Sequence, residues 1–341
     1  MKHFTSQKDT VNNKAISWVQ KNSTIVLLGI TASILVITYI YYIPSLRQTA
    51  ALTVGKEYSL LNPALGILGK ENMIVDFQKL RDSLTSTYEK RDDYLVSIYF
   101  EYLPTGANIS INKDEKIWPA SLIKIPVAMA ALKKVENGKW KLDNELVIMD
   151  EDKDDAYGEL YKEQTGTTHT IEEFLKESLI NSDNTAHFVL LRNIDNKELE
   201  DVYVHLGLDD VIDALKKSPK KDAEDDNRIT AKRYTIFFRS LYNATFLSPL
   251  YSQMFLGILG HAPKELLSKG LPENIQFVHK TGVRVDEAVR ADSGIVYVPG
   301  RPYLITVMVQ QKDKKVINEE KVNAIFEDIS KQIYTYVANP H

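Results

Sequence analysis

The chain has 341 residues, of which 44% are hydrophobic and 26% charged, and its formal net charge is −4. This composition is typical of a globular protein and excludes a wholly disordered chain, and no basic excess points to nucleic acid as a partner. The chain has no cysteine, which excludes disulfides, thiolate metal sites and cysteine nucleophiles. We expect one domain of roughly 250–270 residues with additional segments.

Residues 24–43 form an uncharged apolar run that is long enough to cross a bilayer as a helix. Tyr39, Tyr41 and Tyr42 cluster at its end, as interfacial aromatic residues do. Four lysines precede the run: Lys2, Lys8, Lys14 and Lys21. The positive-inside rule then predicts that residues 1–23 are cytoplasmic and that the rest of the chain lies outside a cell membrane. A cleaved signal peptide is the alternative, but the run is longer than an h-region and no A-x-A site follows.

The segments that follow alternate between weak and strong periodicity. Residues 44–74 have weak periodicity, and we interpret them as a spacer; residues 75–89 have apolar positions at helical spacing. Residues 94–103 and 107–111 predict two strands, because they are rich in β-branched and aromatic residues and flank a Pro-Thr-Gly turn. A helix is expected over 121–136.

The rest of the domain is predicted to be helical in the middle and stranded near the end. Further helices are expected near 171–180, 184–193, 197–206, 231–243 and 324–337, strands at 276–281, 289–298 and 302–311, and a surface loop at 216–228. Strands at both ends can join in one five-stranded antiparallel sheet. The terminal helices would then cover one face, and the helical middle would form a second lobe. We therefore expect an α/β (α+β) fold over residues 75–341.

The first candidate for chemistry is an S-x-x-K sequence made by Ser121 and Lys124 at the start of a predicted helix. One helical turn separates the two side chains, so they share a face. A serine hydroxyl needs a neighbouring base, and a lysine serves as one when burial or other cations lower its pKa. The motif also occurs at Ser218 and Lys221, but that copy lies in a charged loop without a helix, and we reject it.

Two further short motifs follow in the chain, and each has an ordinary structural alternative. Ser182-Asp183-Asn184 opens a predicted helix, where it would also serve as an N-cap. Lys280-Thr281-Gly282 lies on a late strand, where the lysine would otherwise be an exposed charge. The two motifs begin 61 and 98 residues after the preceding one. Their order and their placement on helix start, loop and strand match one known motif set.

With these three motifs the chain resembles the class A β-lactamase-like, penicillin-recognising serine hydrolases over residues 75–341. The resemblance implies a β-lactamase/transpeptidase-like fold. It also implies that Ser121 is acylated by a β-lactam or a peptidyl D-alanine carbonyl and that Lys124 takes its proton. Ser182 would relay a proton to the leaving nitrogen with Lys280 tuning it, and Asn184 would hold the substrate amide and orient Lys124.

The resemblance also implies a set of substrate-binding residues. These are Lys280, Thr281 and Gly282 of the third motif, Val283, Arg290 and Tyr157. Lys280 and Thr281 would bind the substrate carboxylate, and the backbone N–H groups of Ser121 and Val283 would form the oxyanion hole. Arg290 would add positive charge, with a solvated strand arginine as the alternative. Tyr157 would be an aromatic gatepost, with a core or surface tyrosine as the alternative.

The chain departs from the class A pattern in the Ω-loop, which supplies the base for deacylation. No E-x-x-L-N motif occurs between Gly207 and Thr230, and Glu224 is the only glutamate there. Glu224 would serve as the base only if the loop is rebuilt. Acylation without deacylation would describe a penicillin-binding DD-peptidase or transpeptidase. A cell-wall-binding pseudoenzyme is a further alternative.

No cofactor or metal is expected. The seven histidines are scattered without an H-E-x-x-H pattern, and His187 and His279 are interpreted as packing or hydrogen-bonding residues. There is no Walker A or G-x-G-x-x-G sequence. The expected partners are a β-lactam or a peptidoglycan stem peptide and the cell membrane, with no nucleic acid, and we expect a monomer.

Overall fold

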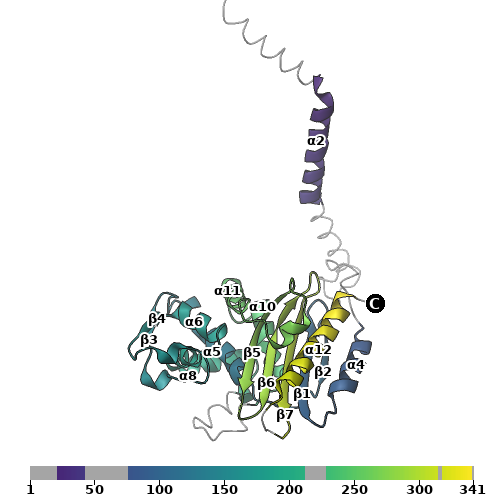
Figure 1. Ribbon diagram of the computed structural model, residues 1–341. Helices are drawn as coiled ribbons and strands as arrows, with labels where there is room; N and C mark the ends of the chain where they lie inside the picture. Colours follow the sequence, from purple (N-terminus) through teal and green to yellow (C-terminus); the bar gives the residue numbers. More distant parts are fainter. Residues whose placement is uncertain (1–20, 43–75, 212–227, 314–316, 340–341) are drawn as a thin grey trace, which may run out of the picture. The chain divides into compact units, whose positions relative to one another are not determined.

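The computed structural model describes residues 21–42, 76–211, 228–313 and 317–339. The chain divides into two compact units, Met1–Lys70 and Glu71–His341. Within the first unit, helix α2 (Ser23–Ile37) continues into a π-helical turn at Thr38–Tyr42 (Figure 1). By length and composition this helix is able to cross a membrane, and none of it is buried in the structure. The predicted spacer at 44–74 and residue 43 lie outside the described residues.

The second unit is built on one antiparallel sheet of five strands in the order β2-β1-β7-β6-β5. Its strands are β1 (Tyr94–Tyr102), β2 (Ala107–Ile111), β5 (Gln276–Arg284), β6 (Val289–Tyr297) and β7 (Tyr303–Gln311). The sheet therefore joins two early strands to three late ones, as the sequence predicted. β7 and β6 are buried along almost their whole length, because helices cover both faces of the sheet. β5 lies at an edge and carries the Lys280 motif.

Helices α4 (Gln78–Tyr88) and α12 (Glu319–Ala338) cover one face of this sheet (Figure 1). Leu84 of α4, Phe326 of α12 and Phe100 of β1 belong to one buried cluster. The terminal helices thus share one side of the sheet, in agreement with the sequence prediction.

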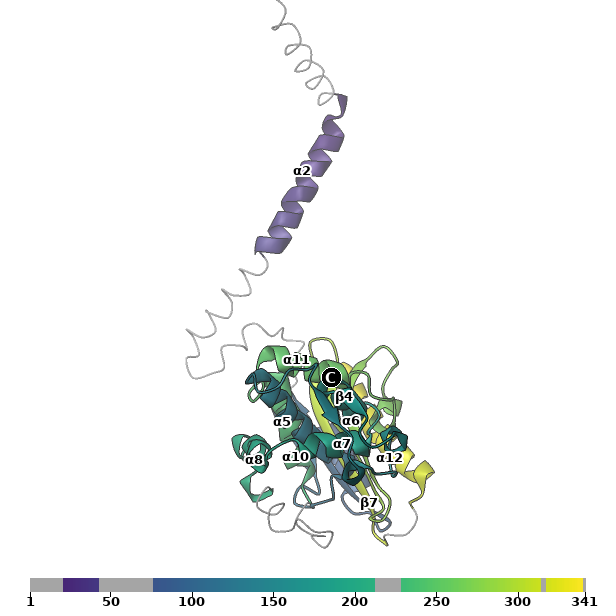
Figure 2. The same ribbon diagram turned by 90° about the vertical axis from the view of Figure 1, so that its left-hand side faces the viewer.

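The helices from the middle of the chain lie on the other side of the sheet and form a lobe (Figure 2). They are α5 (Lys124–Glu136), α6 (Ile171–Leu179), α7 (Asn184–Arg192), α8 (Asn196–His205), α10 (Ala231–Asn243) and α11 (Pro249–Leu259). A second buried cluster joins them to the sheet and includes Met129, Phe237 and Met308. Buried hydroxyl groups add a polar link, because Thr306 hydrogen-bonds Thr235 at 2.5 Å and Ser293 at 2.6 Å.

The structure differs from the prediction at the helix expected over 121–136. A 3₁₀ turn, η4 (Ala120–Ile123), comes first, and the α-helix α5 begins at Lys124. Pro126 is the third residue of α5, where a backbone N–H has no partner within the helix. The proline therefore costs no hydrogen bond, and the structure explains its place.

Several elements were missed or were shorter in the prediction. α12 begins at Glu319 rather than at 324, because the side chain of Asn318 accepts the N–H of Lys321 at 3.0 Å and caps the helix. Helix α11 was not singled out, and neither was the small sheet of β3 (Glu145–Val147) and β4 (Thr168–Thr170). Strands of three residues are too short to show an alternating pattern.

Candidate active site

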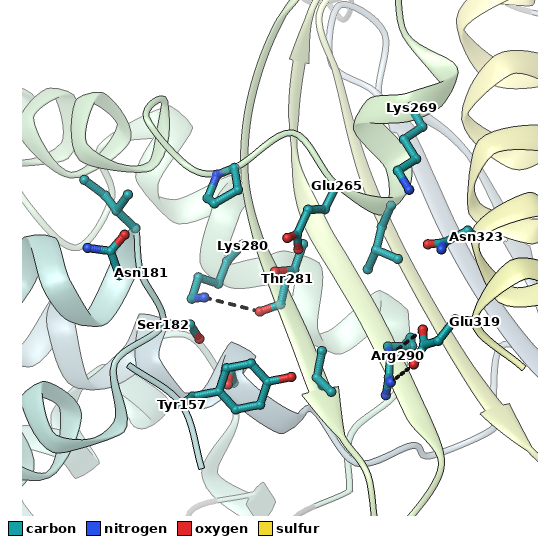
Figure 3. A pocket seen from close by; sticks show the side chains of 15 residues that line it. Tyr157, Asn181, Ser182, Glu265, Lys269, Lys280, Thr281, Arg290, Glu319 and Asn323 are labelled. Atoms are coloured by element: carbon teal, nitrogen blue, oxygen red, sulfur yellow. Dashed lines mark hydrogen bonds and ion pairs between the residues drawn. The ribbon is translucent and has the colours of Figure 1, made fainter. Parts of the chain in front are cut away.

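A cavity of about 470 Å³ brings all three sequence motifs together. Ser121, Ser182, Lys280 and Thr281 line it, and so does Val283. Figure 3 shows the Lys280 side chain reaching between Ser182 and Thr281. The remaining lining residues are Tyr157, Ile180, Asn181, Pro263, Glu265, Leu266, Lys269, Arg290, Glu319 and Asn323. The cavity therefore extends from the helical lobe across the β5 edge to the start of α12.

Ser121 is placed by the close contact between the η4 turn and strand β5. A Cβ atom on Gly282 would lie 2.8 Å from the carbonyl oxygen of Pro119 and 3.2 Å from the Cβ of Ala120. Real Cβ atoms do not approach so closely, so only glycine at position 282 lets β5 lie against the turn. Ala120 also has a φ of 52°, which is unusual for a non-glycine residue and typical of functional sites. The third motif thus fixes the position of Ser121 in the first.

Lys124 lies beneath this cavity with 2% of its surface exposed. Its Nζ donates a hydrogen bond to Asn184 Oδ1 at 2.6 Å and another to the carbonyl oxygen of Ser182. Ser182 Oγ lies 3.3 Å from the same Nζ. All three of these contacts of Lys124 therefore come from the second motif.

The environment of Lys124 favours its neutral form. Burial is the main cause, and the positive charge of Lys280 is the next, and together they lower the pKa of Lys124 to about 7. Asp183 and Asp154 act in the opposite direction and keep the pKa from falling further. An amine with a pKa near 7 is able to accept a proton at neutral pH.

The Ser182-Asp183-Asn184 segment combines an N-cap with functional side chains. Asp183 is fully buried and caps α7, because its Oδ1 accepts the N–H of Ala186 at 2.8 Å. Its Oδ2 accepts the N–H groups of Glu159 at 2.7 Å and Leu160 at 3.0 Å. The capping role considered from the sequence is therefore real, and it belongs to Asp183. Ser182, with a φ of 56°, and Asn184 remain free to hold Lys124.

Asp154 is a site residue that the sequence analysis did not identify. Its Oδ1 accepts a hydrogen bond from Asn184 Nδ2 at 2.7 Å. This bond orients the amide of Asn184 so that its oxygen faces Lys124. In the sequence, Asp154 lies in the acidic run 151–155, which looks like a solvated surface, and nothing in that run signals the contact.

Lys280 is also buried, with 2% of its surface exposed. Burial lowers its pKa to about 8, while the carboxylates of Asp292 and Glu265 oppose that shift. The alternative of an exposed lysine is therefore wrong. Its ammonium group lies 3.3 Å from the carbonyl oxygen of Thr281.

Arg290 and Tyr157 both line the cavity. Arg290 is 8% exposed, so it is not a solvated strand arginine. Its guanidinium forms an ion pair with Glu319 at the N-terminus of α12, with Nε 3.3 Å from Oε2 (Figure 3). Tyr157 is 39% exposed and is thus a surface residue at the cavity rather than a core tyrosine.

The charges of the cavity have mixed sign. Lys269 and Glu265 are exposed residues of its wall; in Figure 3, Glu265 lies beside Thr281 and Lys269 lies toward Asn323. Asn181 and Asn323 add amide groups at opposite ends. Because all four residues lie outside the three motifs, no motif in the sequence points to them. Glu265, Lys269 and Asn323 reach the cavity through the packing of α12 and of the segment before β5, and Asn181 directly precedes the Ser182 motif.

Glu224, His187 and a metal site were also considered from the sequence. Glu224 and the loop around it lie outside the described residues. His187 is 3% exposed, and burial lowers its pKa to about 3, so it is neutral and adds no charge beside Lys124. Within the described residues, no group of three histidine or carboxylate side chains is arranged to hold a metal ion.

The chain is similar to known proteins over most of its length. The model of a family described as "Beta-lactamase enzyme family" matches residues 78–337. Beta-lactamase VEB-1 of Pseudomonas aeruginosa is 26% identical over 249 residues, which are 68% of this chain and 81% of that protein.

Solved structures show the same fold. PBP-A has a TM-score of 0.67 and 23% identity, covering 76% of this chain and 96% of its own. A beta-lactamase from Sphaerobacter thermophilus has a TM-score of 0.68 and 21% identity, covering 78% and 99%. A mutant of PBP-A has been solved as an acyl-enzyme complex with penicillin G.

Proposed function

Because this chain belongs to the Beta-lactamase enzyme family, we propose that Ser121 is acylated by a β-lactam or a D-Ala-D-Ala-like donor. The observation that carries the proposal is the buried amine of Lys124, whose pKa is lowered to about 7. This amine contacts Ser182 and Asn184, and Ser182 lines the same cavity as Ser121. A serine becomes an effective nucleophile when a neighbouring base removes its proton, and Lys124 is the base in this proposal.

The acylation step follows from these positions. Ser121 Oγ attacks the carbonyl carbon while its proton passes to Lys124 Nζ. The C–N bond then breaks, and Ser182 gives its proton to the leaving nitrogen while its Oγ takes the proton from Lys124 Nζ. Ser182 is suited to this relay because its Oγ lies 3.3 Å from Lys124 Nζ. The backbone N–H groups of Ser121 and Val283 would hold the oxyanion.

The cationic side of the cavity suits a substrate carboxylate. Lys280 and Thr281 would bind it directly, since both line the cavity beside Ser121. Arg290 would add positive charge from β6, although its pairing with Glu319 reduces that charge. Tyr157 would flank the substrate at the exposed side, and Gly282 would keep β5 close to the η4 turn.

A penicillin-binding DD-peptidase with slow deacylation is the second candidate. It is favoured by the absence of an E-x-x-L-N motif between Gly207 and Thr230, because that motif carries the deacylation base in the class A pattern. A non-catalytic cell-wall-binding protein is less favoured, because a pure binder needs neither a buried lysine nor its amide partner.

The N-terminal helix supports a location at the cell membrane. The apolar run 24–43 would be an uncleaved single-pass anchor, with residues 1–23 in the cytoplasm and the catalytic domain on the other side, next to peptidoglycan. The partners would be β-lactams or stem peptides, and the enzyme would act as a monomer without a cofactor.

Intact-mass spectrometry of the full chain in detergent tests the proposal. The protein is mixed with a penicillin and sampled over time, with Ser121→Ala as the matched control. We expect a penicilloyl adduct on Ser121 that the Ser121→Ala variant does not form. An adduct that appears and vanishes as the drug is consumed supports a β-lactamase, and one that persists for hours supports the DD-peptidase. No adduct on a folded protein would contradict acylation by β-lactams.

A further inference from the structure

We propose that this chain carries a second nucleophilic serine, Ser268, activated by His279 and Asp292 at a site separate from Ser121. Ser268 Oγ lies 3.3 Å from His279 Nε2, and His279 Nδ1 lies 2.8 Å from Asp292 Oδ1. This is the order of contacts of a Ser–His–Asp triad, in which a carboxylate orients the base and the base faces the nucleophile.

The pairing of β5 with β6 builds this arrangement. His279 lies opposite Gly294, and Asp292 lies two residues before Gly294 on the same face of β6. A Cβ on Gly294 would lie 2.6 Å from the Cβ of His279, so any side chain there would displace the histidine. The ring of Phe277 stacks on the imidazole with its centroid at 4.2 Å. The ring of His279 is therefore held in place beside Asp292.

In this proposal Nε2 of His279 is the base, because it is the ring nitrogen that faces Ser268. Asp292 is fully buried, and its Oδ2 accepts the N–H of Leu267 at 3.1 Å. In the proposed triad, the Asp292 carboxylate accepts a hydrogen bond from the Nδ1–H group of His279. The lone pair of Nε2 then points to Ser268 Oγ and is available for its proton.

Ser268 lies on the 3₁₀ turn η7 (Leu266–Gly270), which is fixed on two sides. The Asp292 carboxylate ties the turn to β6. On the other side, a Cβ on Gly270 would lie 2.4 Å from the carbonyl oxygen of Glu327 in α12, so the turn lies directly against that helix. Leu266 has a φ of 44°, a strained conformation typical of functional turns. The nucleophile is thus held on a rigid element, as catalysis requires.

A second cavity, of about 510 Å³, opens at Ser268 and His279. Lys269 is the residue that it shares with the cavity of Ser121. Apolar residues form much of its wall: Leu271, Pro272, Ile275 and Phe277. Lys264, Lys269, Glu273, Asn274 and Gln276 add polar groups. A wall of this kind suits a carboxylic ester with a small apolar acyl group.

The proposed reaction is ester hydrolysis through an acyl-enzyme. Ser268 Oγ forms a bond to the acyl carbon, and its proton moves to His279 Nε2. The bond to the alkoxy oxygen breaks, and the departing alcohol takes that proton. Water then attacks the acyl carbon with His279 as base, which releases the acid and restores the serine.

Labelling with an alkyl fluorophosphonate tests the proposal in the full chain with Ser121→Ala. The serine oxygen displaces fluoride from phosphorus, so an activated serine gains a phosphonyl group that peptide mapping locates. We expect the label on Ser268, its loss in the Ser121→Ala/Ser268→Ala variant, and parallel loss of p-nitrophenyl butyrate hydrolysis. A folded protein that takes no label at Ser268 would show that the three residues are only a structural link.

A thiol at position 268 gives a second, independent measurement. The chain has no cysteine, so Ser268→Cys introduces a single thiol, and Ser86→Cys on the exposed side of α4 is the matched control. A neighbouring histidine that takes the thiol proton increases the thiolate fraction. We expect iodoacetamide to alkylate the Ser268→Cys protein faster than the control at neutral pH. Equal or slower alkylation would contradict activation by His279.

Discussion

Lys124 shows how a single residue acquires its chemistry from its surroundings. Burial removes the water that would stabilise an ammonium ion, and Lys280 adds a like charge, so the pKa of Lys124 falls to about 7. Asp154 opposes this shift and also holds Asn184, which in turn accepts a hydrogen bond from Lys124. Asp154 therefore has two separable effects on Lys124, one through its charge and one through the orientation of Asn184.

The variant Asp154→Asn separates these effects. Asparagine keeps an oxygen that can accept the Asn184 hydrogen bond, but it removes a negative charge that favours the ammonium form of Lys124. The pKa of Lys124 should therefore fall, and the rate of Ser121 acylation should reach its half-maximum at a lower pH than in the unchanged enzyme. The measurement is the penicillin acylation rate across a pH range that brackets 7.

Asp155→Asn is the matched control for this prediction. Asp155 is the exposed neighbour of Asp154, and its charge is screened by water. The control should keep the pH profile of the unchanged enzyme. If Asp154→Asn raised the half-maximal pH or left it in place, Lys124 would not be the titrating base.

Among the secondary-structure elements, the contact between η4 and β5 decides where Ser121 lies. The turn carries Ser121, and Gly282 permits β5 to approach the carbonyl of Pro119. Helix α5 carries Lys124, and helix α7 begins at Asn184. The site thus depends on four elements, η4, α5, α7 and β5.

The variant Gly282→Ala tests this contact. The added methyl group would lie 2.8 Å from the Pro119 oxygen, so β5 and η4 must separate. We expect a loss of about 1–3 kcal/mol in the free energy of unfolding, as in other overpacked sites. Acylation of Ser121 should slow as well, because the turn that carries Ser121 moves. Thermal denaturation and the penicillin adduct rate measure the two effects.

Gly257→Ala provides the same substitution where there is room. Gly257 lies within α11, and its Cβ would meet nothing within 4 Å. Alanine is the better helix former, so this variant should gain about 0.5–1 kcal/mol of stability. If both variants changed the free energy of unfolding by the same amount, the close approach of β5 to η4 would not be the reason that position 282 requires glycine.

At the scale of the whole molecule, the chain joins a catalytic domain to an apolar helix of membrane-spanning length. We expect the full chain to stay in the membrane fraction after alkaline carbonate extraction. Its intact mass should include residues 1–43, because we propose that the anchor is not cleaved. Recovery of a shorter, extractable protein would show that the segment is a signal peptide.

A charge variant of the anchor gives the matched test. Leu28→Asp together with Ile34→Asp places two carboxylates in the exposed apolar helix. Each aspartate near the centre of a spanning helix costs about 2.5–3.5 kcal/mol of insertion free energy. The variant should leave the membrane fraction, whereas Leu28→Ile with Ile34→Leu should remain in it.

Much of the fold was predictable because its signals are local. The alternating pattern of 107–111 and the helical spacing of 231–243 matched β2 and α10, since periodicity depends only on neighbouring residues. The prediction of an α-helix over 121–136 was wrong in its first turn, which is the 3₁₀ turn η4. The η4 turn depends on packing against β5, a contact across more than 150 residues of sequence that no local pattern reveals.

Residue types and their spacing were enough to predict most of the long helices and strands, the composition of the five-stranded sheet and the three motifs that meet at the cavity. Only the tertiary structure brought Asp154 to Asn184, Glu319 to Arg290 and Ser268 to His279. These pairs belong to no shared motif, and each forms where separate elements pack together. Burial decided the protonation of Lys124. A lysine in water is an ordinary cation, whereas burial lowers the pKa of Lys124 to about 7.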